Sequence, residues 1–327
     1  MEQTSDLLTA ALLPGFGPRK HKELVSRVSL AEGLARPGEH ADIFTRPAQD
    51  QLRSGEVRRR AERELAQARE RGVRIIGLGE ADYPERLARI YDPPLVLYFR
   101  GALVAGEGER SLAVVGSRAV TPQGAALTRA MARDLALAGL TVVSGLARGT
   151  DTAAHRGALE AKGRTVAVLG SGLDRVYPPE NAALADAVAR DGAVVSEFPF
   201  GTDPEPGHFP RRNRILAGWG RAVVVVEAGD KSGALITARL ALEEGREVMA
   251  VPGHPSQPGA QGTNQLIRDG AALVRNGADV ASEMGLLVLT PQTEQPGEGL
   301  LGHLHSEQPR GLDEIQQRSG LTVPDLL

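Results

Sequence analysis

The stretch that decides the fold is GHFPRRNRILAGWGRAVVVVEA, residues 207–228. It contains an entirely apolar run, Ala222 to Val226, which predicts a strand buried on both faces, as in a parallel sheet covered by helices. Just before this run, Arg211, Arg212 and Arg214 lie within four positions. Arginines are rarely buried without partners, so we expect them at a rim of the sheet, facing a phosphate or a carboxylate. The alternative is that they pair with the nearby acids Glu197, Asp203 and Glu227.

Apolar strands and amphipathic helices alternate on both sides of this stretch. We expect strands at 73–78, 94–101, 112–117, 140–145, 165–170, 193–198, 222–227 and 247–253. Helices are expected near 122–138, 151–161, 180–190, 210–218, 233–244 and 263–268. This alternation predicts an α/β fold with a doubly wound, extended Rossmann-like parallel sheet. Such sheets bind ligands outside the carboxyl ends of their strands.

The rest of the chain divides around this sheet domain, which we place at residues 71–284. Residues 1–70 read as a small all-α domain of SAM or helix-hairpin-helix type, with a Gly15-Phe16-Gly17 hairpin between two helices. Such a hairpin offers backbone N–H groups to phosphate, although an ordinary Gly/Pro turn between two helices is the more common explanation. Residues 285–308 are rich in Gly, Pro, Gln and Glu and read as a linker. Residues 309–327 read as the start of a truncated winged-helix domain.

The composition limits the possible classes of function. The 327 residues carry 38 basic and 41 acidic side chains, a net charge of -3. This excludes a surface that is basic everywhere, but not a local basic patch, which suffices to attract nucleic acid. The absence of cysteine excludes disulfides, thiolate zinc sites and cysteine nucleophiles. We predict no metal ion and no cofactor. Because neither a signal peptide nor a membrane-spanning run is apparent, we also predict no membrane anchor and a cytoplasmic location.

Loops that follow the strands carry the candidate binding residues. Gly116, Ser117 and Arg118 follow the strand at 112–117, and glycine there allows the backbone to approach an anion near a helix start. Arg148 stands between two glycines after the next strand. Tyr177 lies in the long 170–181 loop and either stacks on a base or packs against the sheet edge.

The loop before the helix at 233–244 forms a further candidate phosphate seat, with Lys231, Ser232 and Gly233 at the helix start. The earlier glycine of a P-loop is replaced by Val225, so ATP hydrolysis at a P-loop is disfavoured. His155 is more typical of a structural histidine than of a base, and no serine sits in a nucleophile elbow. We therefore predict no catalytic residue.

In a doubly wound sheet all these loops meet at one rim, where their cations exceed their acids. The surplus predicts a cleft that binds an anion with several phosphates. The candidate binding residues of this cleft are Gly116, Ser117, Arg118, Arg148, Arg175, Tyr177, Phe209, Arg211, Arg212, Asn213, Arg214, Lys231, Ser232 and Gly233.

Together these loops resemble the DprA family of DNA processing proteins, also called Smf. The matching motifs run in order from about residue 73 to 284. They are VVGSR (114–118), SGLARGTDTAAH (144–155), GSGLDRVYPPEN (170–181), SEFPFG (196–201), FPRRNRILAG (209–218), VVEAGDKSGALITA (225–238), VPG (251–253) and GTNQLIRDGA (262–271).

The resemblance implies a homodimer without enzymatic turnover that binds single-stranded DNA. It would protect incoming strands in natural transformation and load a RecA-type recombinase for homologous recombination, with a single-strand-binding protein as a further candidate partner. By the same resemblance, Gly116, Ser117 and Arg118 line the strand-binding pocket, and Arg148 and residues 211–214 extend it. Some relatives have a lysine where this chain has Pro179, so another cation (Lys231, Arg175 or Arg212) would compensate, or the affinity would be lower.

Two enzymatic alternatives exist. A nucleoside-monophosphate hydrolase of the lysine-decarboxylase-like group would use Glu227 or Asp151 as base. Its P-G-G-x-G-T-x-x-E motif is replaced here by EAGDKSGALITARLALEE, residues 227–244, without the paired glycines. A dinucleotide-dependent oxidoreductase is disfavoured because the G-x-G-x-x-G fingerprint is absent after the strand at 112–117.

Overall fold

The computed structural model describes residues 2–286. Apart from its first two positions, the predicted linker at 285–308 lies outside the described residues, as does the predicted winged-helix start at 309–327. No helix between residues 2 and 286 has both the length and the apolar character that crossing a bilayer requires.

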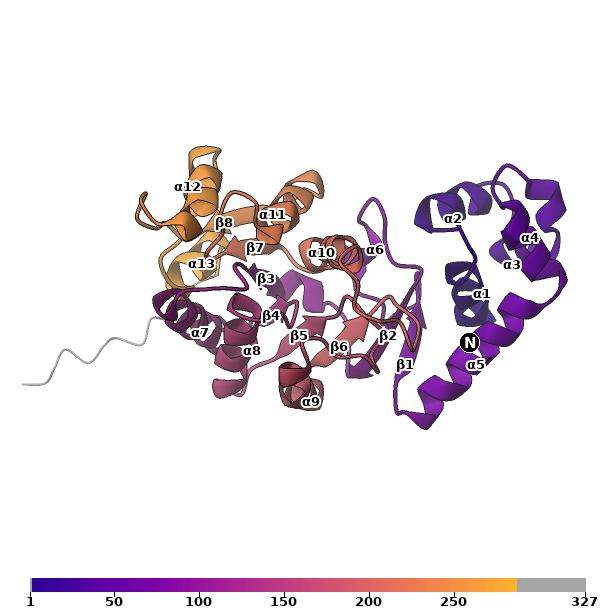
Figure 1. Cartoon of the computed structure of the whole chain (residues 1–327), viewed down its shortest axis with the longest axis horizontal. Helices are drawn as coiled ribbons and strands as arrows, with labels where there is room; N and C mark the ends of the chain where they lie inside the picture. Colours follow the sequence, from indigo (N-terminus) through magenta and orange to yellow (C-terminus); the bar gives the residue numbers. More distant parts are fainter. Residues whose placement is uncertain (1, 287–327) are drawn as a thin grey trace, which may run out of the picture. The chain divides into compact units, whose positions relative to one another are not determined.

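A nine-stranded sheet forms the centre of the fold, in the order β1-β2-β6-β5-β4-β3-β7-β8-β9 (Figure 1). The strands are β1 (Arg74–Gly77), β2 (Val96–Gly101), β3 (Ser111–Val115), β4 (Thr141–Ser144), β5 (Thr165–Val168), β6 (Ala193–Ser196), β7 (Ala222–Val225), β8 (Glu247–Ala250) and β9 (Ala272–Leu273). Neighbours from β6 to β9 pair in parallel, whereas β2 pairs antiparallel with both β1 and β6. The predicted doubly wound α/β fold is confirmed, with an antiparallel extension at one edge.

Helices cover both faces of this sheet (Figure 1). One face carries α7 (Pro122–Leu137), α8 (Thr150–Glu160), α9 (Ala182–Asp191) and α13 (Gly277–Glu283). The other carries α6 (Glu85–Ala88), α10 (His208–Trp219) and α11 (Gly233–Glu243), while α12 (Gln261–Arg268) packs beside β8. Side chains alternate along each strand, so Val224 packs with α7 and Val225 with α10 and α11. Burial on both faces explains the unbroken apolar run from Ala222 to Val226.

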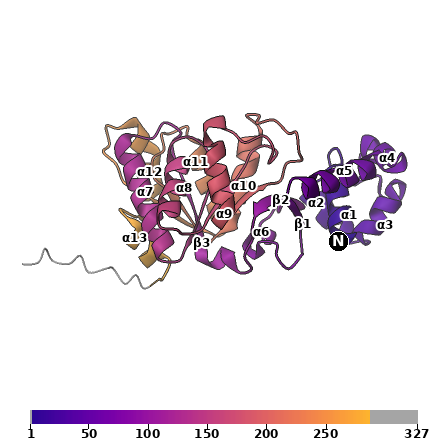
Figure 2. The same cartoon turned by 90° about the horizontal axis from the view of Figure 1, so that it is seen from below.

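The first helices gather in a bundle next to β1 and β2 (Figures 1 and 2). They are α1 (Glu2–Ala11), α2 (Pro18–Val25), α3 (Leu30–Ala35), α4 (Arg46–Arg53) and α5 (Glu56–Glu70). Their core includes Leu24 and Phe44, together with Val96 and Tyr98 of β2. The Tyr98 hydroxyl donates a hydrogen bond of 3.0 Å to Glu64 of α5. Residues up to Leu286 form one compact unit, and a domain boundary at residue 70 stays a prediction.

Candidate nucleic-acid interface

A cavity of about 850 Å³ lies at the carboxyl ends of β3 and β7 and between the first turns of α10 and α11. Most of the predicted site residues line it: Gly116, Ser117, Arg118, Tyr177, Phe209, Arg212, Asn213, Lys231, Ser232 and Gly233. Arg148 lines a smaller pocket that shares Arg118, Tyr177 and Phe209 with the cavity. Arg175, Arg211 and Arg214 line neither of these pockets. The rim of the sheet therefore brings together most of the residues that the sequence singled out, but not all.

Two loops on this rim hold each other in place. The Thr150 backbone N–H donates to the Ser117 carbonyl oxygen at 3.1 Å, and the Thr150 hydroxyl donates to the same oxygen. Gly149 has a φ of +75° and ψ of -122°, a conformation that favours glycine. A Cβ atom there would lie 2.7 Å from the Arg118 carbonyl oxygen and closer still to that of Ser117. The backbone of Ser117 and Arg118 is thus fixed against the start of α8.

Arg118 itself is exposed at the cavity and stacks on an aromatic ring. Its guanidinium carbon lies 4.8 Å from the centroid of Phe209, and the Phe209 ring lies 5.9 Å from that of Tyr177. Among residues 2–286, no carboxylate lies within ion-pair distance of Arg118. An unpaired guanidinium beside two aromatic rings can hold a phosphate while a base stacks next to it.

The start of α11 supplies a second seat for an anion. The Ser232 hydroxyl caps the helix by accepting a hydrogen bond of 3.3 Å from the Ala234 N–H. Gly233 leaves open space where a side chain would stand, and Lys231 is exposed with no ion-pair partner in the described part of the chain. Free N–H groups at a helix start attract negative charge, although Asp230 also lines the cavity and offsets part of it.

Arg212 belongs to the wall of the cavity, not to its exposed cations. It is 4% exposed, and its Nη1 atom donates to the carbonyl oxygens of Gly145, at 2.7 Å, and Val168. Burial lowers its pKa to about 10, although nearby Asp151 favours the charged form. Burial also raises the pKa of Asp151, whose carboxylate accepts hydrogen bonds from the Gly145 and Ala147 N–H groups. Asp151 therefore shapes the loop before α8 and does not cap that helix.

The neighbouring arginines are largely neutralised. Arg211 and Arg214 both donate to Glu197 Oε2, at 2.9 and 2.5 Å, and Arg214 Nε lies 3.4 Å from Asp92. The alternative interpretation, pairing with Glu197, is thus confirmed for these two arginines. Elsewhere on the rim, Arg148 pairs with Glu180 at 2.5 Å and Arg175 lies 3.7 Å from Asp203. The surplus of free cations at this rim is smaller than predicted, and the part played by these four arginines in binding stays a prediction.

Glu227, the third acid considered as a partner for those arginines, has a different role. The Glu227 carboxylate accepts two hydrogen bonds from Thr121, one from its backbone N–H at 3.0 Å and one from its side-chain hydroxyl at 2.5 Å. Thr121 in turn caps α7 by accepting from Gly124 N–H. Glu227 therefore ties β7 to the loop that follows β3 and positions the segment carrying Arg118. Both candidate bases of the enzymatic alternative, Glu227 and Asp151, are engaged by backbone N–H groups.

His155 is a structural residue, as predicted. It is fully buried, and its Nδ1 atom lies 2.8 Å from the Thr165 hydroxyl. Burial, aided by the charge of Arg212, lowers its pKa to about 3. The ring is therefore neutral at physiological pH and joins α8 to β5.

Several lining residues were not predicted from the sequence: Pro204, Pro206, Asp230, Ile236 and Thr237. Ile236 and Thr237 lie one turn after Gly233, so helical spacing would have placed them near the seat at the start of α11. The two prolines lie in the irregular loop between β6 and α10, where no periodic pattern exists to indicate direction.

Sequence comparison relates the chain to proteins of known name. The family model "DNA recombination-mediator protein A" matches residues 74–285. Protein Smf of Synechocystis is 40% identical over 247 residues, which cover 73% of this chain and 62% of that protein. The DNA processing protein DprA of Bacillus subtilis is 41% identical over 222 residues, 68% of this chain and 75% of that protein.

Solved structures agree with these sequence matches. The structure of DprA from Streptococcus pneumoniae has a TM-score of 0.70 and 38% identity, and covers 85% of this chain and 95% of that one. A structure of DNA processing protein A from Helicobacter pylori has a TM-score of 0.57 and 28% identity, and covers 64% and 95%; it concerns the single-stranded DNA binding mode of that protein. The predicted family resemblance is confirmed: the chain belongs to the DNA recombination-mediator protein A family, the DprA or Smf proteins.

Proposed function

We propose that this protein binds single-stranded DNA in the 850 Å³ cavity at the carboxyl end of its sheet. In this proposal it protects incoming strands and loads a RecA-type recombinase onto them, acting as a cytoplasmic homodimer without enzymatic turnover. Membership of the recombination-mediator family supports the general role, and the single-strand binding of the Helicobacter pylori relative supports the ligand.

The single observation that carries the proposal is the unpaired Arg118 guanidinium stacked on Phe209, 4.8 Å from the ring centroid. Its surroundings favour nucleic acid over a simple anion, because Tyr177 stands next to Phe209 and offers a second ring for a base. A phosphate at Arg118 and another at Lys231 and the start of α11 would place a strand across the cavity. Bases in a duplex are already stacked inside the helix, so a site that uses aromatic rings prefers single strands.

The experiment that tests this function is fluorescence anisotropy of a labelled single strand of mixed sequence, with unlabelled duplex as competitor and several salt concentrations. We expect tight binding that weakens steeply with salt and resists duplex. Arg118→Ala should weaken binding about equally for all sequences and reduce the salt slope by roughly 1.

The matched control is Arg190→Ala. Arg190 is also exposed and has no ion-pair partner in the described residues, but it lies at the end of α9, at the opposite rim of the sheet from the cavity. We expect Arg190→Ala to bind like the unchanged protein. Equal losses in both variants would mean non-specific charge attraction, and no binding at low salt would refute the proposal. Release of free adenine from AMP would instead favour the hydrolase.

The recombinase step is testable in the same material. Strand exchange by a RecA-type recombinase on strands covered with single-strand-binding protein should accelerate when this protein is added. The Arg118→Ala variant should accelerate it less, because it holds the strand less tightly. Equal acceleration by both proteins would separate recombinase loading from the cavity.

A further inference from the structure

Tyr91 is an exposed aromatic residue that the cavity does not use. It is 68% exposed, in the segment between α6 and β2. The guanidinium carbon of Arg19, on α2, lies 4.8 Å from the centroid of its ring. Lys22 is also exposed and lies three residues after Arg19, on the same face of α2. Tyr91 thus combines a largely accessible ring with two cations, the combination that single-strand binders use for a base and its phosphate.

The position of Tyr91 relates it to the cavity through two helices. Both α10 and α11 begin at the cavity, where Phe209 and Gly233 line it. Ile90, next to Tyr91, packs on Gly218 near the end of α10, and the Tyr91 N–H donates to Glu244 at the end of α11. The 11 residues of α11 span roughly 16 Å. A strand leaving the cavity along the exposed side of α11 therefore reaches Tyr91 within about five nucleotides, the number that applies at the short 3.4 Å spacing of stacked bases in a duplex.

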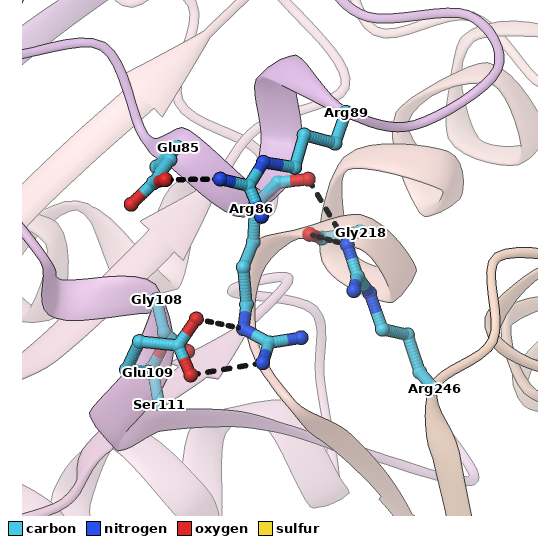
Figure 3. Close-up of polar contacts among 8 residues, drawn as sticks. All are labelled: Glu85, Arg86, Arg89, Gly108, Glu109, Ser111, Gly218 and Arg246. Atoms are coloured by element: carbon cyan, nitrogen blue, oxygen red, sulfur yellow. Dashed lines mark hydrogen bonds and ion pairs between the residues drawn. The ribbon is translucent and has the colours of Figure 1, made fainter.

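Polar contacts of Arg246 and Arg86, here called the clamp, hold the segment between α6 and β2 against the sheet domain (Figure 3). Arg246, just before β8, donates through Nη2 to the carbonyl oxygen of Arg86 at 3.0 Å and to that of Gly218 at 3.4 Å. The Arg86 side chain makes a two-pronged ion pair with Glu109, at 2.8 and 2.9 Å. The clamp joins α6, the end of α10 and the start of β8, so Tyr91 is presented from a fixed position and needs little ordering on binding.

Three acids near this segment already have cationic partners, whereas Glu244, which accepts from the Tyr91 N–H, has none in the described residues. Asp92 lies 3.4 Å from Arg214, Glu85 pairs with Arg89, and Glu23 pairs with Arg27 at 2.5 Å. Arg19 and Lys22, in contrast, have no carboxylate partner in the described residues. This face of α2 therefore presents two cations without carboxylate partners, although the whole chain carries -3.

We propose that Tyr91, Arg19 and Lys22 form a second contact for single-stranded DNA, a stacking platform that receives the strand after it leaves the cavity along α11. The inference rests on the proposed function of the cavity. In it, a base stacks on the exposed surface of the Tyr91–Arg19 pair and Lys22 contacts the phosphate beside it.

The test compares two oligonucleotide lengths, about 4 nucleotides to occupy the cavity alone and about 15 to reach Tyr91, within the site sizes of single-strand binders. For Tyr91→Ala we expect unchanged affinity for the short strand and about tenfold weaker binding of the long one. Tyr91→Phe keeps the ring and should restore the long-strand affinity. The control Leu137→Ala removes an equally exposed apolar side chain from α7, on the other face of the sheet, and should change neither affinity.

A direct readout uses the 15-nucleotide strand with 5-bromodeoxyuridine at single positions and ultraviolet cross-linking. Cross-links to the peptide containing Tyr91 should appear for positions a few nucleotides away from those that cross-link near Phe209, and not for those positions themselves. The platform would be overturned if Tyr91→Ala left the affinity for the long strand unchanged. It would also be overturned if this variant lost equal affinity for both strand lengths and had a lower unfolding temperature. Either result would leave Tyr91 as a structural contact of α2. Failure of the unchanged protein to bind either strand would refute the cavity's function instead.

Discussion

At the scale of single residues, arginines close in sequence have different roles because their burial differs. Arg118 is exposed and stacks on Phe209, so its charge is available to a ligand. Arg212 is buried and holds the carbonyl oxygens of Gly145 and Val168. Arg211, the residue before Arg212, shares the Glu197 carboxylate with Arg214. Sequence proximity therefore says little about which cation is free to meet a ligand.

Arg212→Met should destabilise the protein. The substitution removes a buried charge that faces Asp151, and it leaves two buried carbonyl oxygens without the N–H group that donates to them. Removing one partner from a buried set of this kind costs about 3 kcal/mol or more, which lowers the unfolding temperature of a domain this size by roughly 6 to 12 °C. Arg211→Met is the matched control, since its side chain is 57% exposed and Glu197 keeps Arg214. Thermal unfolding followed by circular dichroism decides the matter, and equal shifts in the two variants would contradict a structural role for Arg212.

His155 makes stability depend on pH. Its pKa is lowered from 6.5 to about 3 in the folded chain, so the unfolded chain binds a proton in this range that the folded chain does not. Its contribution is complete above pH 6.5 and is lost progressively as the pH falls toward 3. Between pH 7 and pH 5 this group should lower the free energy of unfolding by about 2 kcal/mol. Urea titrations at both pH values should show a correspondingly smaller loss for His155→Asn; an identical loss would mean that the ring is protonated in the folded protein.

At the scale of elements, the binding rim depends on contacts between loops that follow different strands. The loop after β3 is held by Thr150 at the start of α8 and by Glu227 at the end of β7. Because β3 lies between β4 and β7 in the sheet, both neighbours can reach this loop. The sheet order thus explains why the backbone of the loop that carries Arg118 is held from two sides.

Gly149→Ala should weaken both stability and DNA binding. The added methyl group would collide with the carbonyl oxygens of Ser117 and Arg118, so the backbone of that loop must move, and Arg118 with it. Gly201→Ala is a matched control, since Gly201 has a similar φ of +76° but nothing within 4 Å of the added atom. We expect Gly201→Ala to cost about 1 kcal/mol of stability, from backbone strain alone, and to leave single-strand affinity unchanged.

Anisotropy titrations and thermal unfolding of the two glycine variants separate these effects. Gly149→Ala should lose more affinity than Gly201→Ala even at temperatures where both variants are folded. If the two variants bound DNA equally well, the contact between the loops would not position Arg118.

At the scale of the whole molecule, the sequence predicted what depends on local pattern and missed what depends on neighbours in space. The parallel strands and their helices were predicted because apolar runs and helical spacing are local signals. Strand β9 has only two residues and α13 only seven, too few for a periodic signal, and neither was predicted.

The candidate site shows the same division between local and spatial information. The convergence of the loops on one rim followed from strand order and was predicted, and most of the singled-out residues do line one cavity. The pairing of Arg214 with Asp92 and the burial of Arg212 depend on segments distant in sequence. Charge counts over loops therefore overestimated the number of free cations, because a count does not show which acid of the rim pairs with which arginine or which arginine is buried.

The last prediction concerns how the chain divides. A protein ending at residue 286 should keep its unfolding temperature and its single-strand affinity, because residues up to Leu286 form one compact unit that contains the cavity. A protein of residues 71–286 should be much less stable, because it lacks the helices that cover Leu95 and Val96 and the Glu64 carboxylate that accepts from Tyr98. Thermal unfolding of both proteins is the measurement. Equal unfolding temperatures would establish residues 1–70 as an independent domain, whereas aggregation or a strongly lowered temperature of the shorter protein would mean that the bundle completes the edge of the sheet.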